Sequence, residues 1–146
     1  MKKILFIILI LLAVAFVGYK MYNKPHTDVQ SSEVLKSFSA AELFSVFVLG
    51  EAQSMAQYAD KVIAVTGVVY LKDFSNDLEP QLVLKANGDN GYIRCGFKPS
   101  EMSKLNQVKE GQNINIKGLC KGINGSEELD LLADIDVVMS NCIIIN

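Results

Sequence analysis

Tyr92 and Arg94 are the residues of this sequence that come nearest to a recognition site. They stand two positions apart in the run YIRCGF, where alternation of apolar and polar residues predicts a β-strand with both side chains on its outer face. An aromatic ring beside a guanidinium can stack on a nucleic-acid base or hold a carboxylate. Lys85, Tyr70 and Lys117 are outward residues of neighbouring predicted strands and could extend the same ligand-binding face. The alternative is an exposed strand face with ordinary polar decoration.

The sequence carries none of the usual patterns of catalysis or metal binding. Its only histidine, His26, falls in a polar linker, and there is no phosphate-binding GxxxxGK loop. Asp134-Ile135-Asp136 would place two carboxylates on one side of a strand and could hold a calcium ion, but it lacks the spacing of a calcium loop. A solvated acidic loop is the favoured interpretation. We therefore predict that the protein is not an enzyme and uses no cofactor and no metal.

Three cysteines, Cys95, Cys120 and Cys142, allow at most one internal disulfide. Their spacing is not that of a zinc site, which favours close CxxC pairs together with histidines. Alternation places Cys95 and Cys120 on the inner faces of their strands, where a thiol behaves as a small apolar residue. We predict a disulfide between Cys120 and Cys142, because these two residues flank the long acidic segment. Three buried free thiols are the alternative.

The charge of the chain is unevenly distributed. Four of the fourteen basic residues are lysines within the first 24 positions, whereas all sixteen acidic residues come later. Residues 25–146 therefore carry ten basic against sixteen acidic side chains, a net charge of −6, compared with −2 for the whole chain. This sign opposes binding to phosphate backbones without sequence preference. Nucleic acid is therefore an unfavoured partner.

The first residues predict a transmembrane segment. Residues 4–19 carry no charge and end at Lys20, whose long side chain can reach the membrane interface, so that the apolar span extends two residues further. We predict that residues 1–22 form an uncleaved signal anchor, which contacts the membrane through residues 4–22 and leaves the remainder in the periplasm or outside the cell. The alternative is export of the protein after cleavage of a secretory signal at Ala15.

Between this segment and the strands, the sequence predicts a linker over residues 23–38 and an amphipathic helix over residues 39–58. Ser39 is placed as the N-cap and Glu42 follows three residues later, a pair that is typical of a capping box. Gly50 either ends this helix or only weakens it. The apolar residues of the helix fall on one broad face, which indicates packing: Leu43, Phe44, Phe47 and Val48.

Over residues 59–146 the period changes from that of a helix to the alternation of strands. Five strands are predicted, with a short helix between the third and the fourth and long loops after the first and the fourth. Gly67, inside the first strand, predicts a bend or a bulge. This pattern is typical of the OB-fold, a Greek-key barrel that binds ligands on the outer face of strands two and three. In such a barrel the last strand lies between the third and the fourth.

The predicted fold class is therefore mainly β with helices (α+β): a five-stranded OB barrel, preceded by an amphipathic helix and a transmembrane helix. The predicted strands begin near Lys61, Gln81, Tyr92, Asn113 and Val137.

Several blocks of the sequence resemble a known family. In chain order they are NKPHTDV, SAAELFSVF, KVIAVTGVV, YIRCGF, EGQNINIKGLCKG and VVMSNCIII. Over residues 23–146 the sequence resembles the tRNA-anti-like OB-fold family of small exported or membrane-anchored bacterial proteins. The resemblance implies an OB barrel, and it implies no catalytic residue.

These observations favour a membrane-anchored, non-catalytic OB-fold binding module that faces the periplasm or the exterior. Its expected ligand is a protein or another component of the cell envelope, because the acidic charge disfavours nucleic acid. Two alternatives stay open: a domain that binds single-stranded nucleic acid, and a purely structural protein of envelope assembly.

Overall fold

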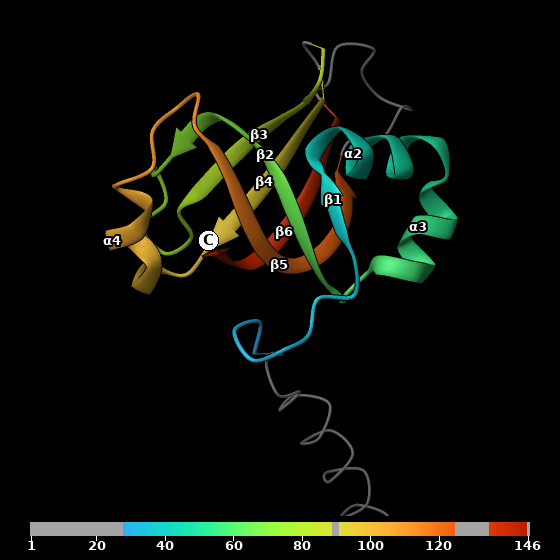
Figure 1. The fold of residues 1–146 in the computed structure, drawn as a ribbon, viewed down its shortest axis with the longest axis horizontal. Helices are drawn as coiled ribbons and strands as arrows, with labels where there is room; N and C mark the ends of the chain where they lie inside the picture. The colour runs from blue at the N-terminus through green and yellow to red at the C-terminus, as the bar shows by residue number, and fades with distance from the viewer. Residues whose placement is uncertain (1–27, 89–90, 125–134, 146) are drawn as a thin grey trace, which may run out of the picture.

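The alternating segments form five long strands in the computed structural model, which describes residues 28–88, 91–124 and 135–145. The strands join in the order β2-β3-β4-β6-β5, and β2 pairs again with β5, so that the sheet closes into a barrel (Figure 1). The β4–β6 pair is parallel and the other pairs of the barrel are antiparallel. The last strand lies between the third and the fourth, as predicted for an OB barrel. The bounds are β2 (Val62–Asp73), β3 (Gln81–Asn87), β4 (Gly91–Phe97), β5 (Asn113–Asn124) and β6 (Ile135–Ile145).

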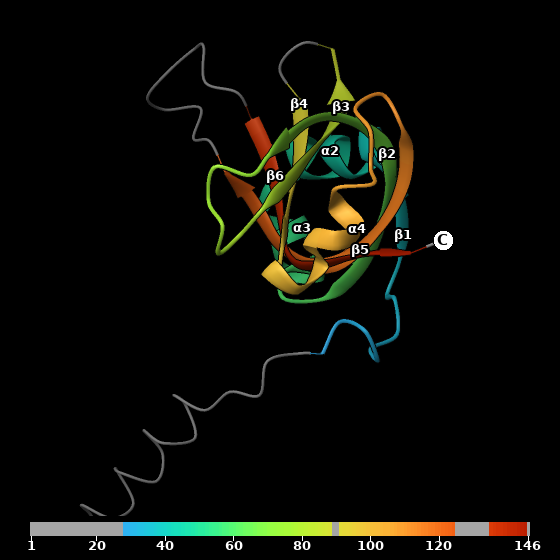
Figure 2. The same ribbon diagram turned by 90° about the vertical axis from the view of Figure 1, so that its left-hand side faces the viewer.

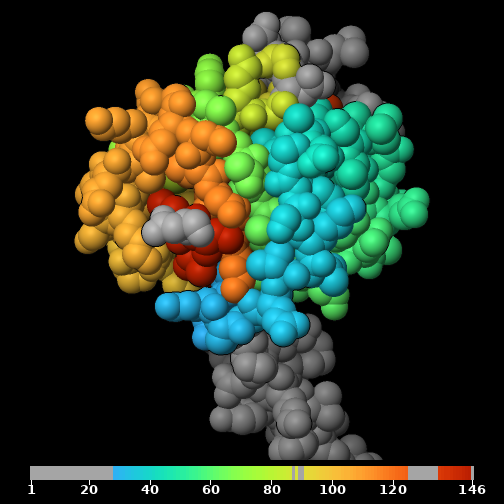
Figure 3. Space-filling view, viewed as in Figure 1, coloured from blue at the N-terminus to red at the C-terminus, as the bar shows by residue number. Residues whose placement is uncertain are grey.

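A short additional strand, β1 (Ser37–Ser39), was not predicted. It pairs in parallel with Ala64–Thr66 of β2, a stretch that β3 does not reach because β3 pairs with β2 only from Val68 onward. Backbone groups at an open strand edge need partners, and β1 supplies them there. We refer to residues 28–39, which lead into and include β1, as the strap. In the space-filling view the strap (blue to cyan) begins at the lower edge of the molecule and then runs upward across the face shown (Figure 3).

The strap contacts the barrel through residues outside β1 as well. Val29 is buried with Val62 and Leu119, and the N–H of Leu35 donates to the carbonyl oxygen of Val62 at 2.8 Å. The described part of the predicted linker is thus packed against the strands.

The capping box at Ser39 is confirmed. The Ser39 hydroxyl oxygen accepts from the N–H of Glu42 at 3.2 Å, and the Glu42 carboxylate accepts from the N–H of Ser39 at 2.8 Å. These hydrogen bonds lower the pKa of Glu42. Gly50 ends the first helix, so the predicted helical region consists of α2 (Ala40–Leu49) and α3 (Glu51–Tyr58).

Helices cover both ends of the barrel, as the view along its axis shows (Figure 2). At one end α2 contacts β1, β2, β3, β4 and β6 and buries Leu43, Phe44 and Phe47 in the main core. Val48, predicted on the same apolar face, is instead 45% exposed. At the other end a 3₁₀ turn (Pro99–Glu101) leads into α4 (Met102–Leu105), the predicted helix between the third and fourth barrel strands. The core therefore fills the barrel from end to end.

Gly67 was predicted to make a bend or a bulge. β2 changes its partner from β5 to β3 at the adjacent Val68, but the bulge lies elsewhere. The register of β2 against β3 shifts between Val69 and Leu71, so that Tyr70 is the extra residue. A Cβ at Gly67 would lie 2.9 Å from the Cβ of Ala40. Gly67 therefore serves the close packing of α2 on the barrel.

The three cysteines are free thiols and are buried. The predicted Cys120–Cys142 disulfide is not formed, because Cys120 lies opposite Met139 in the β5–β6 register. Cys142 lies farther along β6, where a Cβ at Gly118 would come 2.5 Å from its Sγ atom. The inward positions predicted for Cys95 and Cys120 are confirmed.

Replacing Gly118 with alanine is expected to destabilise the fold by about 1–3 kcal/mol, because the added methyl group overpacks the site beside Cys142. Urea unfolding followed by circular dichroism measures this change. Gly50→Ala is the control, since a Cβ there would meet only the carbonyl oxygen of Val46, at 3.9 Å. Gly118→Ala should cost less in a Cys142→Ala background. An equal cost in both backgrounds would contradict the contact with Cys142.

Candidate ligand-binding face

The outer surface of β2, β3 and β4 brings together most of the predicted ligand-binding residues. The strand register sets Val68, Lys85 and Tyr92 in one row, and Leu71, Val83 and Arg94 in the next. The first row continues onto β6 with Asp136, and the second with Val138. We refer to this surface as the tyrosine face; its members are Val68, Tyr70, Leu71, Lys85, Tyr92, Arg94 and Asp136.

Two tyrosines form the centre of this face. The ring centroids of Tyr70 and Tyr92 lie 5.1 Å apart with an angle of 33° between the ring planes. Tyr70 is 51% exposed, and the flanking Val68 and Leu71 are each 45% exposed. A cluster of exposed aromatic and aliphatic side chains on neighbouring strands is typical of an interaction surface. Leu71 was not predicted on this face, because the bulge at Tyr70 breaks the alternation that placed it inward. Val68 is outward by alternation, but nothing in the sequence marked it as a binding residue.

Arg94 is engaged in an ion pair with Asp136. Its Nε and Nη2 atoms both donate to Oδ2 of Asp136, at 2.9 and 2.6 Å, and Nη1 lies 3.5 Å from Oε1 of Gln81. The side chain of Arg94 is 36% exposed, whereas that of Asp136 is 9% exposed. The guanidinium is therefore already occupied by a carboxylate of the same chain.

Asp136 has one oxygen without a hydrogen bond. Among the described residues, its Oδ1 atom is buried and has no partner. The solvated loop favoured for Asp134 and Asp136 is wrong at Asp136, which is buried in β6 and paired with Arg94; Asp134 lies outside the described residues. No sequence signal pointed to the Arg94–Asp136 pair, since the two residues are 42 positions apart.

Asp73 is a further carboxylate close to Arg94. The side chain and the backbone N–H of Ser75 both donate to Oδ1 of Asp73, at 2.6 and 3.1 Å. These hydrogen bonds lower the pKa of Asp73, and the charge of Arg94 lowers it further. The charge of Arg94 is thus offset by the paired Asp136 and, more weakly, by Asp73, which reduces its attraction for an anionic ligand.

Lys117 is not part of the tyrosine face. It lies on β5, paired with Ala64 and Ile143, and its Nζ atom donates to the carbonyl oxygen of Gln30 at 3.3 Å. Lys117 is buried because the strap covers the outer side of β5 at this point. Lys117 thus binds the strap to β5. Alternation indicates that its side chain points outward, but it does not indicate that the strap covers this side chain.

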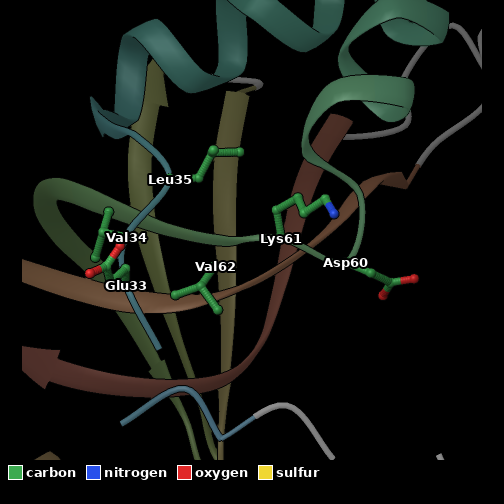
Figure 4. Close-up of a pocket in the computed structure, with 6 residues that line it drawn as sticks. All are labelled: Glu33, Val34, Leu35, Asp60, Lys61 and Val62. Carbon is green, nitrogen blue, oxygen red and sulfur yellow. The ribbon is translucent and has the colours of Figure 1, made fainter. Parts of the chain in front are cut away.

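An open pocket of about 570 Å³ lies between the strap and the start of β2 (Figure 4). Its charged side chains do not converge: the carboxylates of Glu33 and Asp60 lie at opposite sides of the view. Asp60 accepts a hydrogen bond from Nζ of Lys121 at 2.6 Å. The tyrosine face is therefore the better candidate site.

Two further findings concern metal ions and membranes. Within residues 28–88, 91–124 and 135–145, no group of three histidine, cysteine, aspartate or glutamate side chains could hold a metal ion. Among the same residues, no helix is long and apolar enough to span a membrane. The predicted anchor, residues 1–22, lies outside the described residues.

Comparison with known proteins identifies a family and similar folds. The family model named tRNA_anti-like matches residues 1–134. No curated protein sequence matches the chain significantly. Among solved structures, a putative nucleic acid-binding lipoprotein from Klebsiella pneumoniae is 16% identical, with a TM-score of 0.59 over 84% of this chain and 100% of that chain. At this identity the likeness concerns the fold alone.

Two aminoacyl-tRNA synthetases share a weaker likeness. A putative aspartyl-tRNA synthetase from Leishmania major is 13% identical, with a TM-score of 0.47 over 90% of this chain and 25% of that chain. The asparaginyl-tRNA synthetase of Entamoeba histolytica is 15% identical, with a TM-score of 0.46 over 80% of this chain and 24% of that chain. The present chain thus spans about a quarter of either synthetase.

Proposed function

This chain belongs to the tRNA_anti-like family, and we propose that it is a non-catalytic binding module that takes a segment of another polypeptide across the tyrosine face. The fold supports a binding role, because OB domains hold their ligands on the outer face of the second and third barrel strands, here β3 and β4. The tyrosine face lies on these two strands and on the adjoining parts of β2 and β6.

The composition of the face supports a polypeptide as the ligand. The strongest support for the proposal is the contact between Tyr70 and Tyr92, which is flanked by the exposed aliphatic side chains of Val68 and Leu71. Aromatic residues are enriched at the centres of protein interfaces, where charged residues are depleted. A polypeptide can cover this apolar area with its own side chains, and its main chain carries no phosphate charge for the acidic domain to repel.

We also propose that residues 4–22 anchor the protein in the membrane, so that the partner is a component of the cell envelope. The uncharged run of residues 4–19, preceded by two lysines and closed by Lys20, supports this placement. Exposure of the domain on the outer side of the membrane would leave its acidic surface among proteins and not among nucleic acids.

A photo-crosslinking amino acid at position 70 of the full chain, in living cells, is expected to form adducts with another polypeptide. The same amino acid at Leu49 should form few adducts, because Leu49 is 87% exposed but belongs to α2, which is not part of the tyrosine face. The Tyr92→Ala change should lower the adduct yield at position 70 several-fold. Gel shifts and mass spectrometry of the adducts measure these outcomes. Equal yields at positions 70 and 49 would argue against the proposal.

Single-stranded nucleic acid is the second candidate ligand. It is favoured by the position of Tyr92 beside Arg94, since aromatic rings with an arginine can stack successive bases. Fluorescence anisotropy with labelled DNA and RNA oligonucleotides tests this candidate. We expect no appreciable binding at physiological salt, because residues 25–146 carry a net charge of −6. Micromolar binding that weakens as salt rises would favour nucleic acid instead.

A further inference from the structure

We propose that the tyrosine face selects polypeptide segments that carry a lysine or an arginine, and that Asp136 is the residue that binds this cation. The proposal rests on the proposed function and names the chemical class of its ligand. When the ligand binds, its basic side chain replaces Arg94 in the ion pair with Asp136.

Asp136 lies where a ligand on the tyrosine face would meet it. In the strand register it is the neighbour of Tyr92, at the end of the row that begins with Val68. A segment that crosses β2, β3 and β4 along this row passes over Tyr92 and reaches Asp136 next. The apolar part of the ligand and its cation are thus received by adjacent residues.

The hydrogen bonding of Asp136 is incomplete. Arg94 donates twice, but both hydrogen bonds end on Oδ2 of Asp136, and the buried Oδ1 atom has no partner among the described residues. A buried carboxylate oxygen without a donor is unfavourable, since folding has removed it from water without a replacement. Arg94 reaches Asp136 from a fixed position on β4, whereas the cation of a ligand can take a position from which it donates to both oxygens.

The side chain of Arg94 can leave the ion pair more readily than the side chain of Asp136 can. The side chain of Arg94 is 36% exposed and can extend into solvent, whereas that of Asp136 is 9% exposed. An exchange of cations keeps the charge of Asp136 compensated throughout binding.

Two features of the surroundings favour a cation and act against the charges of Lys85 and Arg94 on the same face. The ring of Tyr70, which is 51% exposed, can contact an ammonium or a guanidinium, as in other cation–π contacts. The net charge of −6 over residues 25–146 draws basic segments toward the domain at long range. Apolar contact and charge therefore select the same kind of ligand.

Selection from a displayed library of random peptides tests the proposal, with the full chain in detergent as the target. We expect the selected peptides to be enriched several-fold in lysine or arginine at one position among apolar residues. Replacing that basic residue with norleucine in a synthetic peptide should weaken binding about tenfold, the range of one charge-assisted hydrogen bond. Fluorescence anisotropy measures the affinities.

Two variants separate this role from a purely structural ion pair. Asp136→Asn should remove the preference for the basic peptide over its norleucine analogue. Arg94→Lys, which keeps the charge but loses the second donor on Oδ2, should strengthen binding of the basic peptide several-fold, because Asp136 is then released more easily. Should Asp136→Asn fail to fold, the Arg94→Lys variant still gives the answer.

The outcomes distinguish the two proposals. Selected peptides without a basic preference, whose binding is lost in Tyr92→Ala, would overturn the role of Asp136 and leave the proposed function standing. Unchanged affinity in Arg94→Lys would likewise overturn the role of Asp136. A library that yields no peptide above background would overturn polypeptide binding itself.

Discussion

Replacing Phe47 with alanine is expected to lower the free energy of unfolding by about 3–5 kcal/mol, the usual cost of removing a buried phenylalanine ring. Phe47 is fully buried where α2 covers the end of the barrel, and its ring centroid lies 6.5 Å from that of Tyr58 in α3. The ring thus joins both helices to the core of the barrel. Urea unfolding of the full chain, followed by circular dichroism, measures the change.

Leu49 provides the matched control for Phe47 on the same helix. It is 87% exposed, so Leu49→Ala should change the free energy of unfolding by no more than about 0.5 kcal/mol. Similar values for the two variants would mean that α2 is not part of the core. The expected difference would establish that α2 must be kept in any shortened form of the domain.

Raising the pH from 9 to about 11 is expected to destabilise the domain through Cys120. Burial raises the pKa of the Cys120 thiol from 9.0 to about 11. In this window the unfolded chain loses the proton while the folded protein keeps it, so ionisation favours the unfolded state. The loss can reach about 3 kcal/mol for a shift of this size. Burial, and next the contact with Cys95, raise the pKa of Cys142 in the same direction.

The Cys120→Ala variant isolates this contribution. Its free energy of unfolding should fall less steeply across the same pH range, because the other titrating groups are unchanged. Unfolding at a series of pH values, with and without the substitution, gives the two slopes. In addition, three thiols should react with an alkylating reagent after unfolding without reductant. Parallel slopes would contradict the pKa of Cys120, and recovery of a single thiol would indicate a disulfide.

Local patterns in the sequence predicted the fold well. Ser39 and Glu42 are three residues apart and form the capping box without help from distant residues. Alternation likewise predicted the five barrel strands and the buried positions of Cys95 and Cys120, because the inner face of a strand can be recognised from the residues of that strand alone. The bulge was misplaced, because Gly67 serves contact with Ala40, and that contact depends on where α2 packs.

The candidate site was only partly predictable, because its chemistry depends on pairs that are distant in the chain. Tyr70 and Tyr92 were correctly assigned to one outer face, but alternation cannot show that their rings touch. The pairing of Arg94 with Asp136 requires β4 and β6 to lie side by side in one register. Lys117 was misassigned because outward alternation does not reveal whether another segment, here the strap, covers the strand.

The position of β6 sets the order in which the barrel can be completed during synthesis. β6 follows the other barrel strands in the chain, yet it hydrogen-bonds to β4 on one side and to β5 on the other. Until residues 135–145 have left the ribosome, both of these strands have an edge without its partner. Open strand edges are the sites at which unfinished chains pair with one another. The nascent chain, more than the finished protein, is therefore the form most exposed to aggregation.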